Sequence, residues 1–278
     1  MWNAILDALL DTAKLIPFLL ITYLAMEYLE HRTGDKSADA VRKAGKFGPV
    51  LGSLLGVVPQ CGFSAAAANL YAGRVITLGT LMSIYLSTSD EMLPILISEH
   101  APIAVILKIL AGKAVFGMAA GLLIDLIFRK EADEHEHIHE LCEHDHCDCE
   151  NHFVRSAIVH TVQITLFILL FSVCFNLLLL FVGEEAIAGI ILDKPVIGPV
   201  LSALVGLIPN CAGSVAITQL YLKGMIGLGA AFGGLLTGTG VGLLILFRVN
   251  KHRKENLLIL ALLYAIGAVS GIILELIF

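Results

Sequence analysis

Charged residues are scarce in this sequence. Asp, Glu, Lys and Arg together make up 15% of its 278 residues, one tryptophan is present, and hydrophobic residues account for 57%. A soluble enzyme of this length would need a far more charged surface, so we expect an integral membrane protein instead. Apolar runs of about 20 residues recur along the chain, and about 20 helical residues are enough to cross the hydrocarbon core of a bilayer.

The sequence also lacks the motifs of ATP-driven chemistry. It contains no glycine-rich phosphate-binding loop and no phosphorylated-aspartate motif, and it leaves no room for a soluble ATP-binding domain. We therefore expect no enzymatic activity, no cofactor and no nucleic-acid partner. The lipid bilayer is the expected partner, and a homo-oligomer stays open.

The two halves of the chain repeat each other. The tetrapeptide Pro-Gln-Cys-Gly at 59–62 returns as Pro-Asn-Cys-Ala at 209–212, and 15 of 32 residues are identical between 48–79 and 198–229. A composition this apolar would give only a few identities by chance, so we predict a duplicated unit. The predicted parts are a first transmembrane repeat at 1–128, a central loop at 129–155 and a second transmembrane repeat at 156–278.

The charges of the loops predict that the repeats are inverted. The loop at 30–47 contains five basic residues and its counterpart at 182–197 contains one, whereas 98–100 contains none and its counterpart at 248–255 contains four. Lys and Arg accumulate in cytoplasmic loops, so equivalent loops lie on opposite sides of the membrane. We predict an all-α polytopic protein of the cell inner (plasma) membrane, with a cytoplasmic central loop and both termini outside.

Inversion requires that each repeat crosses the membrane an odd number of times. The stretch at 48–72 consists of two apolar pieces of about eleven residues, each of which rises about 16 Å as a helix, half of a bilayer. We therefore favour one full span, a re-entrant hairpin at 48–72, a broken span at 75–98 and a full span at 104–128. Three short crossings within 48–98 would also give each repeat an odd number of crossings.

The polar break of each repeat is the candidate substrate site. Irregular backbone inside a membrane is tolerated only where protein or a water-filled cavity surrounds it, and paired broken helices hold the substrate in many secondary transporters. Amide oxygens, thiolates and N-cap-like hydroxyls would serve as ligands there, whereas a purely structural kink is the alternative. The predicted substrate-binding residues are Gln60, Cys61, Ser64, Ser87, Asp90, Glu91, Asn210, Cys211, Ser214 and Thr237.

Three charged side chains are predicted inside the membrane. Asp90 and Glu91 occur in the first repeat only, since Gly240 and Val241 stand at the equivalent positions. A buried carboxylate costs several kcal/mol unless it is paired, protonated or bound to a cation, so the pair suits a cation site or proton coupling. Alternatively, the pair faces water near a surface. Lys113 is expected to pair with one of these carboxylates, and Asp90 and Lys113 are the predicted coupling residues.

The central loop predicts a flexible metal chelator. Positions 131–150 contain nine acidic residues and neither Lys nor Arg, and without these nine charges the formal net charge of −6 becomes +3. Imidazole, thiolate and carboxylate together can bind Zn²⁺, Ni²⁺, Co²⁺ or Cu⁺, although the spacing matches no fixed zinc module. The alternative is a solvated acidic linker. The predicted ligands are His135, His137, His139, Cys142, His144, His146, Cys147, Cys149 and His152.

These motifs resemble those of a known transporter family. The Gly-Pro-Val-Leu segments at 48–51 and 198–201, the Pro-Gln-Cys and Pro-Asn-Cys breaks and the His-rich loop are similar to those of the manganese transporters, also described as ten-span heavy-metal exporters of an arsenic-efflux-like type. The resemblance covers essentially the whole chain and implies efflux of a divalent metal through the two breaks. Manganese would favour oxygen ligands such as Gln60, Asn210 and Asp90, whereas arsenite or a soft metal would favour the cysteines at the breaks.

From the sequence we expect a secondary-active transporter that exports a divalent transition metal, with Mn²⁺ favoured, by alternating access coupled to protons. A permease for arsenite or another thiol-reactive or anionic solute is the first alternative, because helix N-termini beyond the breaks would attract an anion. A membrane-embedded metal sensor, in which the central loop is the working part, is the alternative from another class.

Overall fold

The structure is a computed structural model, and all regular secondary structure in the part of the chain that it describes is α-helical apart from a single 3₁₀ residue, Phe47. The described residues are 6, 9–10, 12–13, 16–17, 19–21, 23–24, 47–58, 61–89, 92–128, 158–159, 161–170, 173–174, 196–209 and 211–277. The central loop, with all of its predicted metal ligands, therefore lies outside the described residues.

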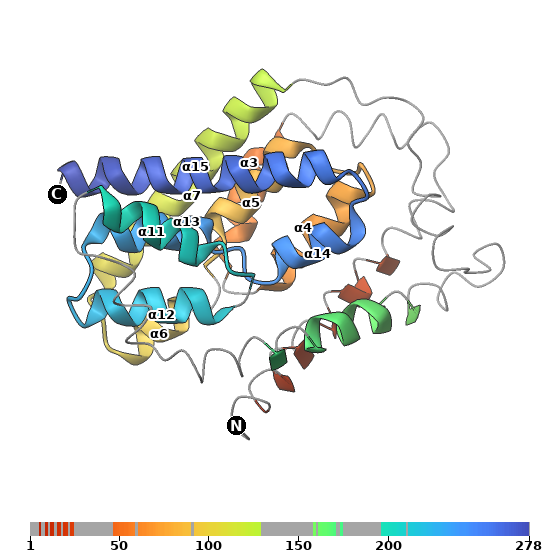
Figure 1. Cartoon of the computed structure of the whole chain (residues 1–278), viewed down its shortest axis with the longest axis horizontal. Helices are drawn as coiled ribbons and strands as arrows, with labels where there is room; N and C mark the ends of the chain where they lie inside the picture. The colour runs from red at the N-terminus through yellow and green to blue at the C-terminus, as the bar shows by residue number, and fades with distance from the viewer. Residues whose placement is uncertain are drawn as a thin grey trace.

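The named helices fall into two series with the period of the sequence repeat (Figure 1). The first series is α3 (Gly48–Gly56), α4 (Cys61–Ala72), α5 (Leu78–Ser87), α6 (Met92–Ser98) and α7 (Ile103–Ile127). The second is α11 (Ile197–Gly206), α12 (Cys211–Leu222), α13 (Leu228–Thr237), α14 (Gly242–Val249) and α15 (Arg253–Ile277). Each helix of the second series begins and ends within one residue of the position 150 residues after its counterpart.

The interruptions predicted from the sequence are breaks between helices. α3 ends at Gly56 before α4 begins at Cys61, and α5 ends at Ser87 before α6 begins at Met92. Pro59 lies in the first break, where its missing N–H and the restriction it places on the preceding residue disfavour a continuous helix. The predicted unbroken spans at 104–128 and 256–278 are α7 and α15, each 25 residues long.

The broken stretch made of α13 and α14 lies inside the molecule, and the unbroken helices α7 and α15 lie outside. Three stretches of the described chain are long and apolar enough to cross a membrane: Ile103–Ile127, Leu228–Val249 and Arg253–Ile277. The second comprises α13, the break and α14, and 89% of its apolar window is buried, against 22% for α7 and 33% for α15. In Figure 1, α15 runs toward the C terminus whereas α7 runs away from that end of the molecule.

Glycines allow the backbones within each half to approach closely. A Cβ added at Gly79 of α5 would lie 2.2 Å from the carbonyl oxygen of Gly121 in α7, and one added at Gly121 would lie 2.5 Å from the carbonyl oxygen of Gly79. The equivalent pair, Gly229 of α13 and Gly271 of α15, gives 2.3 and 2.7 Å. Small residues at helix contacts are typical of membrane proteins, where close packing replaces the hydrophobic driving force.

Two carboxylates bind the N-termini of the central helices. Asp125 accepts hydrogen bonds from the backbone N–H of Gly79 and the hydroxyl of Thr77, both at 2.8 Å. Glu275, at the equivalent end of α15, accepts a hydrogen bond from the backbone N–H of Ala230 at 3.1 Å. A carboxylate satisfies the unpaired N–H groups of a helix start and interacts favourably with its dipole. Solvation in the interfacial region, which the sequence position alone suggests for both residues, is therefore not their main role.

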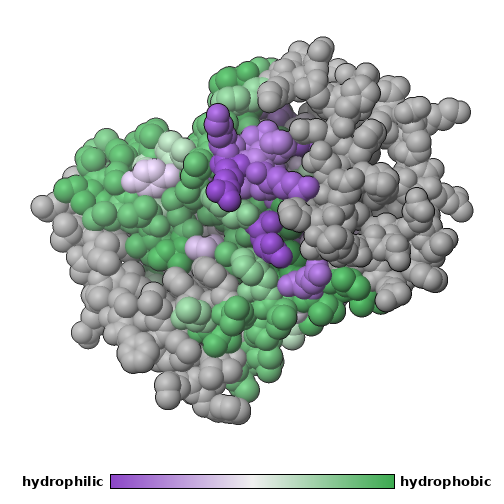
Figure 2. Space-filling view, turned by 45° about the vertical axis from the view of Figure 1, so that its right-hand side comes forward, coloured by the Kyte–Doolittle hydropathy of each residue, from purple (hydrophilic) through white to green (hydrophobic). Residues whose placement is uncertain are grey.

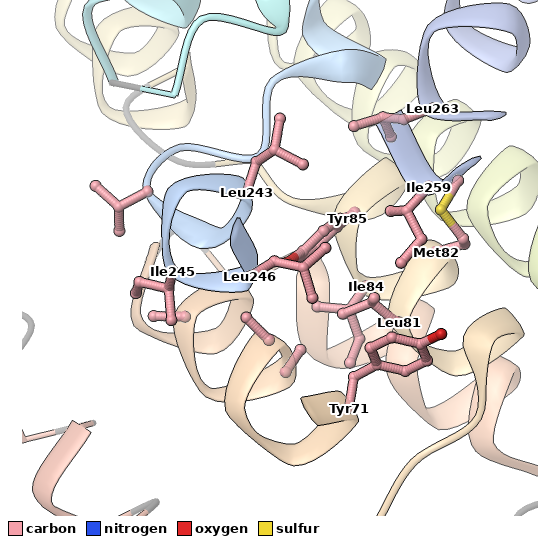
Figure 3. Packing of buried hydrophobic residues seen from close by; sticks show 14 of the residues in the cluster. Tyr71, Leu81, Met82, Ile84, Tyr85, Leu243, Ile245, Leu246, Ile259 and Leu263 are labelled. Carbon is pink, nitrogen blue, oxygen red and sulfur yellow. The ribbon is translucent and has the colours of Figure 1, made fainter. Parts of the chain in front are cut away.

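The two halves are joined because one helix of each half packs on a helix of the other. α4 of the first half packs on α14 of the second, and α12 of the second half packs on α6 of the first. The larger core cluster accordingly mixes both halves, with Tyr85, Leu243 and Leu246 lying close together (Figure 3). The second cluster also contains side chains of both halves, among them Met92 and Ile217, so each core cluster is completed only when the halves pack together.

The outer surface suits a lipid environment. Large apolar side chains are exposed along α7 and α15, among them Val115, Leu123 and Val269. On the face shown in Figure 2, hydrophilic residues gather around the turn between α14 and α15, where residues 251–254 are all exposed. The described surface thus combines an apolar belt with a basic end, as expected for a protein that spans a membrane.

Candidate substrate-binding site

The site is built from the four helix breaks, which lie next to one another. Within the first half, the hydroxyl of Ser89, in the second break, donates a hydrogen bond to the carbonyl oxygen of Val57, in the first break, at 2.6 Å. In the second half, a Cβ added at Gly206, at the end of α11, would lie 2.2 Å from the hydroxyl oxygen of Thr237, at the end of α13. The breaks of each half therefore meet in pairs.

A hydrogen bond at the start of α4 joins the breaks of one half to those of the other. The hydroxyl of Ser64 donates to the carbonyl oxygen of Thr239 at 2.9 Å, and Ser64 is completely buried. A Cβ added at Gly242, the first residue of α14, would lie 2.7 Å from the Cβ of Ser64. The start of α4 therefore lies directly against the break between α13 and α14.

The predicted N-cap-like role of the two serines is wrong. α4 begins at Cys61 and α12 begins at Cys211, so Ser64 and Ser214 are each the fourth residue of their helix. Ser64 uses its hydroxyl to bind the other half of the protein, and Ser214 lies 3.9 Å from where a Cβ of Gly238 would be. Both serines are buried at the edge of a break, because one helical turn separates the break from the face that packs on the neighbouring element.

Ser87 and Thr237 belong to the contacts between helices. Ser87 donates its hydroxyl hydrogen to carbonyl oxygens of its own helix, 2.7 Å from that of Ser83 and 3.1 Å from that of Ile84. The hydroxyl of Thr237 lies 2.8 Å from the carbonyl oxygen of Ala203 in α11. Both side chains are completely buried, and Ser87 faces the end of α3 whereas Thr237 faces the end of α11.

The buried side chain of Lys113 reaches across the interface between the halves. It lies on α7, is 1% exposed, and its ammonium group donates a hydrogen bond to the carbonyl oxygen of Leu235 in the last turn of α13. The carbonyl end of a helix carries a partial negative charge, which favours a cation there. The predicted partners Asp90 and Glu91 lie outside the described residues, and so their pairing with Lys113 stays a prediction.

Several predicted site residues cannot be placed. Gln60 and Asn210 lie outside the described residues, and of Cys61 and Cys211 the structure describes the helix position but not the side chain. Gln60 and Asn210 directly precede α4 and α12 in the sequence, and Cys61 and Cys211 are the first residues of these helices. Within the described ranges, no group of three or more His, Cys, Asp or Glu side chains could hold a metal ion.

Two side chains at the junction were missed from the sequence. Tyr85 is completely buried and donates its hydroxyl hydrogen at 2.9 Å to the carbonyl oxygen of Gly242, the residue that Ser64 also contacts. Ser89 lies in the interruption that the sequence indicates, but it was not selected as a site residue. The sequence does contain a sign of the role of Tyr85, because a polar tyrosine stands here where the second repeat has the apolar Leu235.

A family described as "Putative, 10TM heavy-metal exporter" matches residues 1–181 and 116–247, which together cover most of the sequence. The chain belongs to this family. This heavy-metal exporter family agrees with the resemblance inferred from the motifs, and it is not a class of enzymes. Searches of curated proteins and of solved structures find no significant match.

Proposed function

We propose that the protein is a secondary-active exporter of a divalent transition metal that works by alternating access. The observation that carries the proposal is the junction of the breaks, where Ser64 of one half binds the backbone of Thr239 in the other at 2.9 Å. Irregular backbone at this depth needs polar surroundings, and a site between two repeats is reached from either side when the repeats rock against each other. Membership of a heavy-metal exporter family supports the same activity.

A cation suits the junction better than an anion. The hydroxyls of Ser64 and Ser89 and that of Tyr85 all direct their hydrogen toward backbone carbonyl oxygens. What such a hydroxyl can still offer a ligand is the lone pairs of its oxygen, and these bind cations. Gln60, Asn210 and Asp90 would add further oxygen atoms, and an oxygen-rich site favours a hard ion such as Mn²⁺ over a soft one.

Inverted repeats with re-entrant hairpins are the topology that we propose. The reversed distribution of basic residues among equivalent loops supports it. In this topology α3 and α4 enter from the cytoplasm and return to it, and α11 and α12 do the same from outside. The central loop then lies in the cytoplasm and the termini outside, in the plasma membrane.

Proton exchange is the coupling that we propose. Lys113 holds a positive charge within the interface, and Asp90 supplies a carboxylate whose protonation would alternate with metal binding. A buried ammonium group and a buried carboxylate are each costly to desolvate, so their charges are expected to be compensated in every state of the cycle.

A permease for arsenite or an anionic solute is the second candidate, because Lys113 is a buried cation at the junction. A metal-resistance profile of cells that express the protein, with intracellular metals quantified, separates the two candidates. Lower intracellular Mn²⁺ and resistance to added Mn²⁺ would support the first. Resistance to arsenite alone would replace it with the second, and no change in any metal or in arsenite would contradict both.

A further inference from the structure

The two contacts that join the halves are not equally tight. Between α4 and α14, Ser64 and Gly242 lie so close that a Cβ added at Gly242 would be 2.7 Å from that of Ser64, and Tyr85 ties the first residue of α14 to α5. Ala65 and Ala68 of α4 and Leu246 of α14 are completely buried in the same cluster. The first half is therefore packed firmly against the second at this contact.

An ion pair joins α4 and α15 at the end of the same contact that is farther from the helix breaks. The guanidinium of Arg74, two residues beyond α4, lies 3.0 Å from the carboxylate of Glu255 in the first turn of α15, and both side chains are 28% exposed. The hydroxyl of Tyr71 lies 3.4 Å from the same carboxylate oxygen, and the guanidinium lies 5.5 Å from the centre of the Tyr71 ring. These three residues, Tyr71, Arg74 and Glu255, are called the α4 gate below.

Among the residues that the structure describes, the second half keeps the tyrosine of this gate, as Tyr221, but has no counterpart of its ion pair. Gly224 stands at the position equivalent to Arg74, and Val105 at the position equivalent to Glu255. A Cβ added at Gly224 would meet no atom within 4 Å, and the neighbouring Leu222 and Met225 are 36% and 49% exposed. The first-half equivalents, Ala72 and Val75, are less exposed. Within the described part of the chain, the end of α12 is therefore more exposed than the end of α4.

The backbone at the gate supports a specific role for the arginine. Arg74 and Gly224 both have left-handed backbone conformations, with φ of 58° and 68°. Glycine adopts this conformation without strain, whereas a residue with a side chain is disfavoured in it. The first half therefore accepts an unfavourable conformation at the position that supplies the guanidinium to Glu255.

We propose that the α4 gate closes one end of the transport pathway and that this conformation is open toward the α12 end. The inference rests on the proposed transport by alternating access, in which two equivalent contacts open in turn. The gate lies beside the basic turn at 251–254, so under the proposed topology the closed end faces the cytoplasm. A partly exposed ion pair is weak enough to break once in every cycle.

The first test measures the closed contact directly, in the purified full-length chain in detergent. An A68C substitution places a thiol in the buried face of α4, and its maleimide labelling rate is measured as the difference from the parent chain. Arg74→Gly, which copies the second half, is expected to raise this rate about two- to fivefold, the factor expected for loss of a partly exposed ion pair. Glu255→Val should give the same increase, and the double variant no more than either single change.

The matched control is Lys254→Ala, which removes a positive charge from the same turn but not from the gate. It should leave the labelling rate unchanged. An equal increase in the control, or no increase with Arg74→Gly and Glu255→Val, would overturn the proposal.

The second test asks whether the gate must open for transport. R74C and E255C are combined, cross-linked with a bifunctional methanethiosulfonate reagent that forms reducible disulfides, and assayed for Mn²⁺ flux in vesicles before and after reduction. The parent chain is treated in the same way to correct for its native cysteines. Cross-linking should abolish flux and reduction should restore it, and undiminished flux after cross-linking would overturn the gate. If the parent chain moves no metal while the labelling rates change as expected, the proposed function fails and the closed contact stands.

Discussion

The polar side chains at the junction are held by backbone carbonyls of neighbouring elements. Ser64 donates to Thr239, and Lys113 donates to Leu235, so each bond joins the two halves. The carbonyl oxygen of Thr239 also accepts a hydrogen bond from the backbone N–H of Gly242 at 3.1 Å, so Ser64 binds its second lone pair. The side chains that bind these carbonyls therefore stabilise the breaks and at the same time fix where the two halves meet.

The ligand atoms at the breaks can be distinguished by substitution. If Gln60, Asn210 and Asp90 bind a hard cation, Asp90→Asn should lower Mn²⁺ efflux at least about tenfold, because it removes the charge that offsets dehydration of the ion. Cys61→Ser and Cys211→Ser should retain much of the flux, since a hydroxyl oxygen also suits a hard ion. Flux of Mn²⁺ and of Zn²⁺ or arsenite through the same reconstituted variants is the measurement.

If the substrate is arsenite or a soft metal ion, we expect the opposite ranking of these variants. The serine variants would then abolish transport, while Asp90→Asn would alter only the coupling. Serine variants that are folded but inactive toward Mn²⁺ would therefore contradict the oxygen-rich site. Protein amount and monodispersity in detergent have to match the parent chain for the comparison to hold.

At the scale of helices, backbone contact between α5 and α7 determines how each half is assembled. Gly79 and Gly121 leave no space for a side chain, and Asp125 then reaches the N-terminus of α5 from the end of α7. The same arrangement recurs with Gly229, Gly271 and Glu275. Each half is therefore a rigid group of helices to which the broken elements are attached.

Gly121→Ile should destabilise this group strongly. The new side chain would meet the backbone of Gly79, which cannot rotate away, so we expect at least the cost of overpacking a core, about 1–3 kcal/mol. The apparent melting temperature of the protein in detergent, followed by size-exclusion chromatography after heating, should fall by several degrees. Ala119→Ile, on the exposed face of the same helix, should leave it nearly unchanged. Equal melting temperatures for both variants would contradict the close packing.

At the scale of the whole molecule, the topology is open to a direct test. A single cysteine introduced within 182–197 should be labelled from outside intact cells, whereas one within 36–46 should be labelled only after permeabilisation, because basic loops remain in the cytoplasm. Labelling is compared with the parent chain to correct for native cysteines. If both positions react in intact cells, the repeats are not inverted.

The central loop should affect regulation rather than flux itself. A tether that binds metal raises the local metal concentration without forming the pathway, so deletion of 131–150 should preserve basal transport and weaken the apparent affinity for metal. Flux measured over a range of metal concentrations in vesicles shows either change. If the deletion variant is stably expressed and transports nothing, the loop is the working part, and a metal sensor becomes the better description.

The sequence alone determined the periodic part of the fold. Apolar runs, proline-containing breaks and identities 150 residues apart locate the helices, because these features depend on local backbone chemistry and on hydrocarbon thickness. The long spans α7 and α15 and the breaks after Gly56 and Ser87 lie where the sequence predicts them.

Only the tertiary structure decided which atoms meet. The exchange of α4 and α12 between the halves, the bond from Lys113 to Leu235 and the ion pair of Arg74 with Glu255 join residues more than 100 positions apart. Neither helical period nor composition specifies such pairs, since they depend on how whole helices pack. The two halves share a sequence pattern, but their unequal contacts follow from single differences such as Arg74 against Gly224, which acquire meaning only beside Glu255.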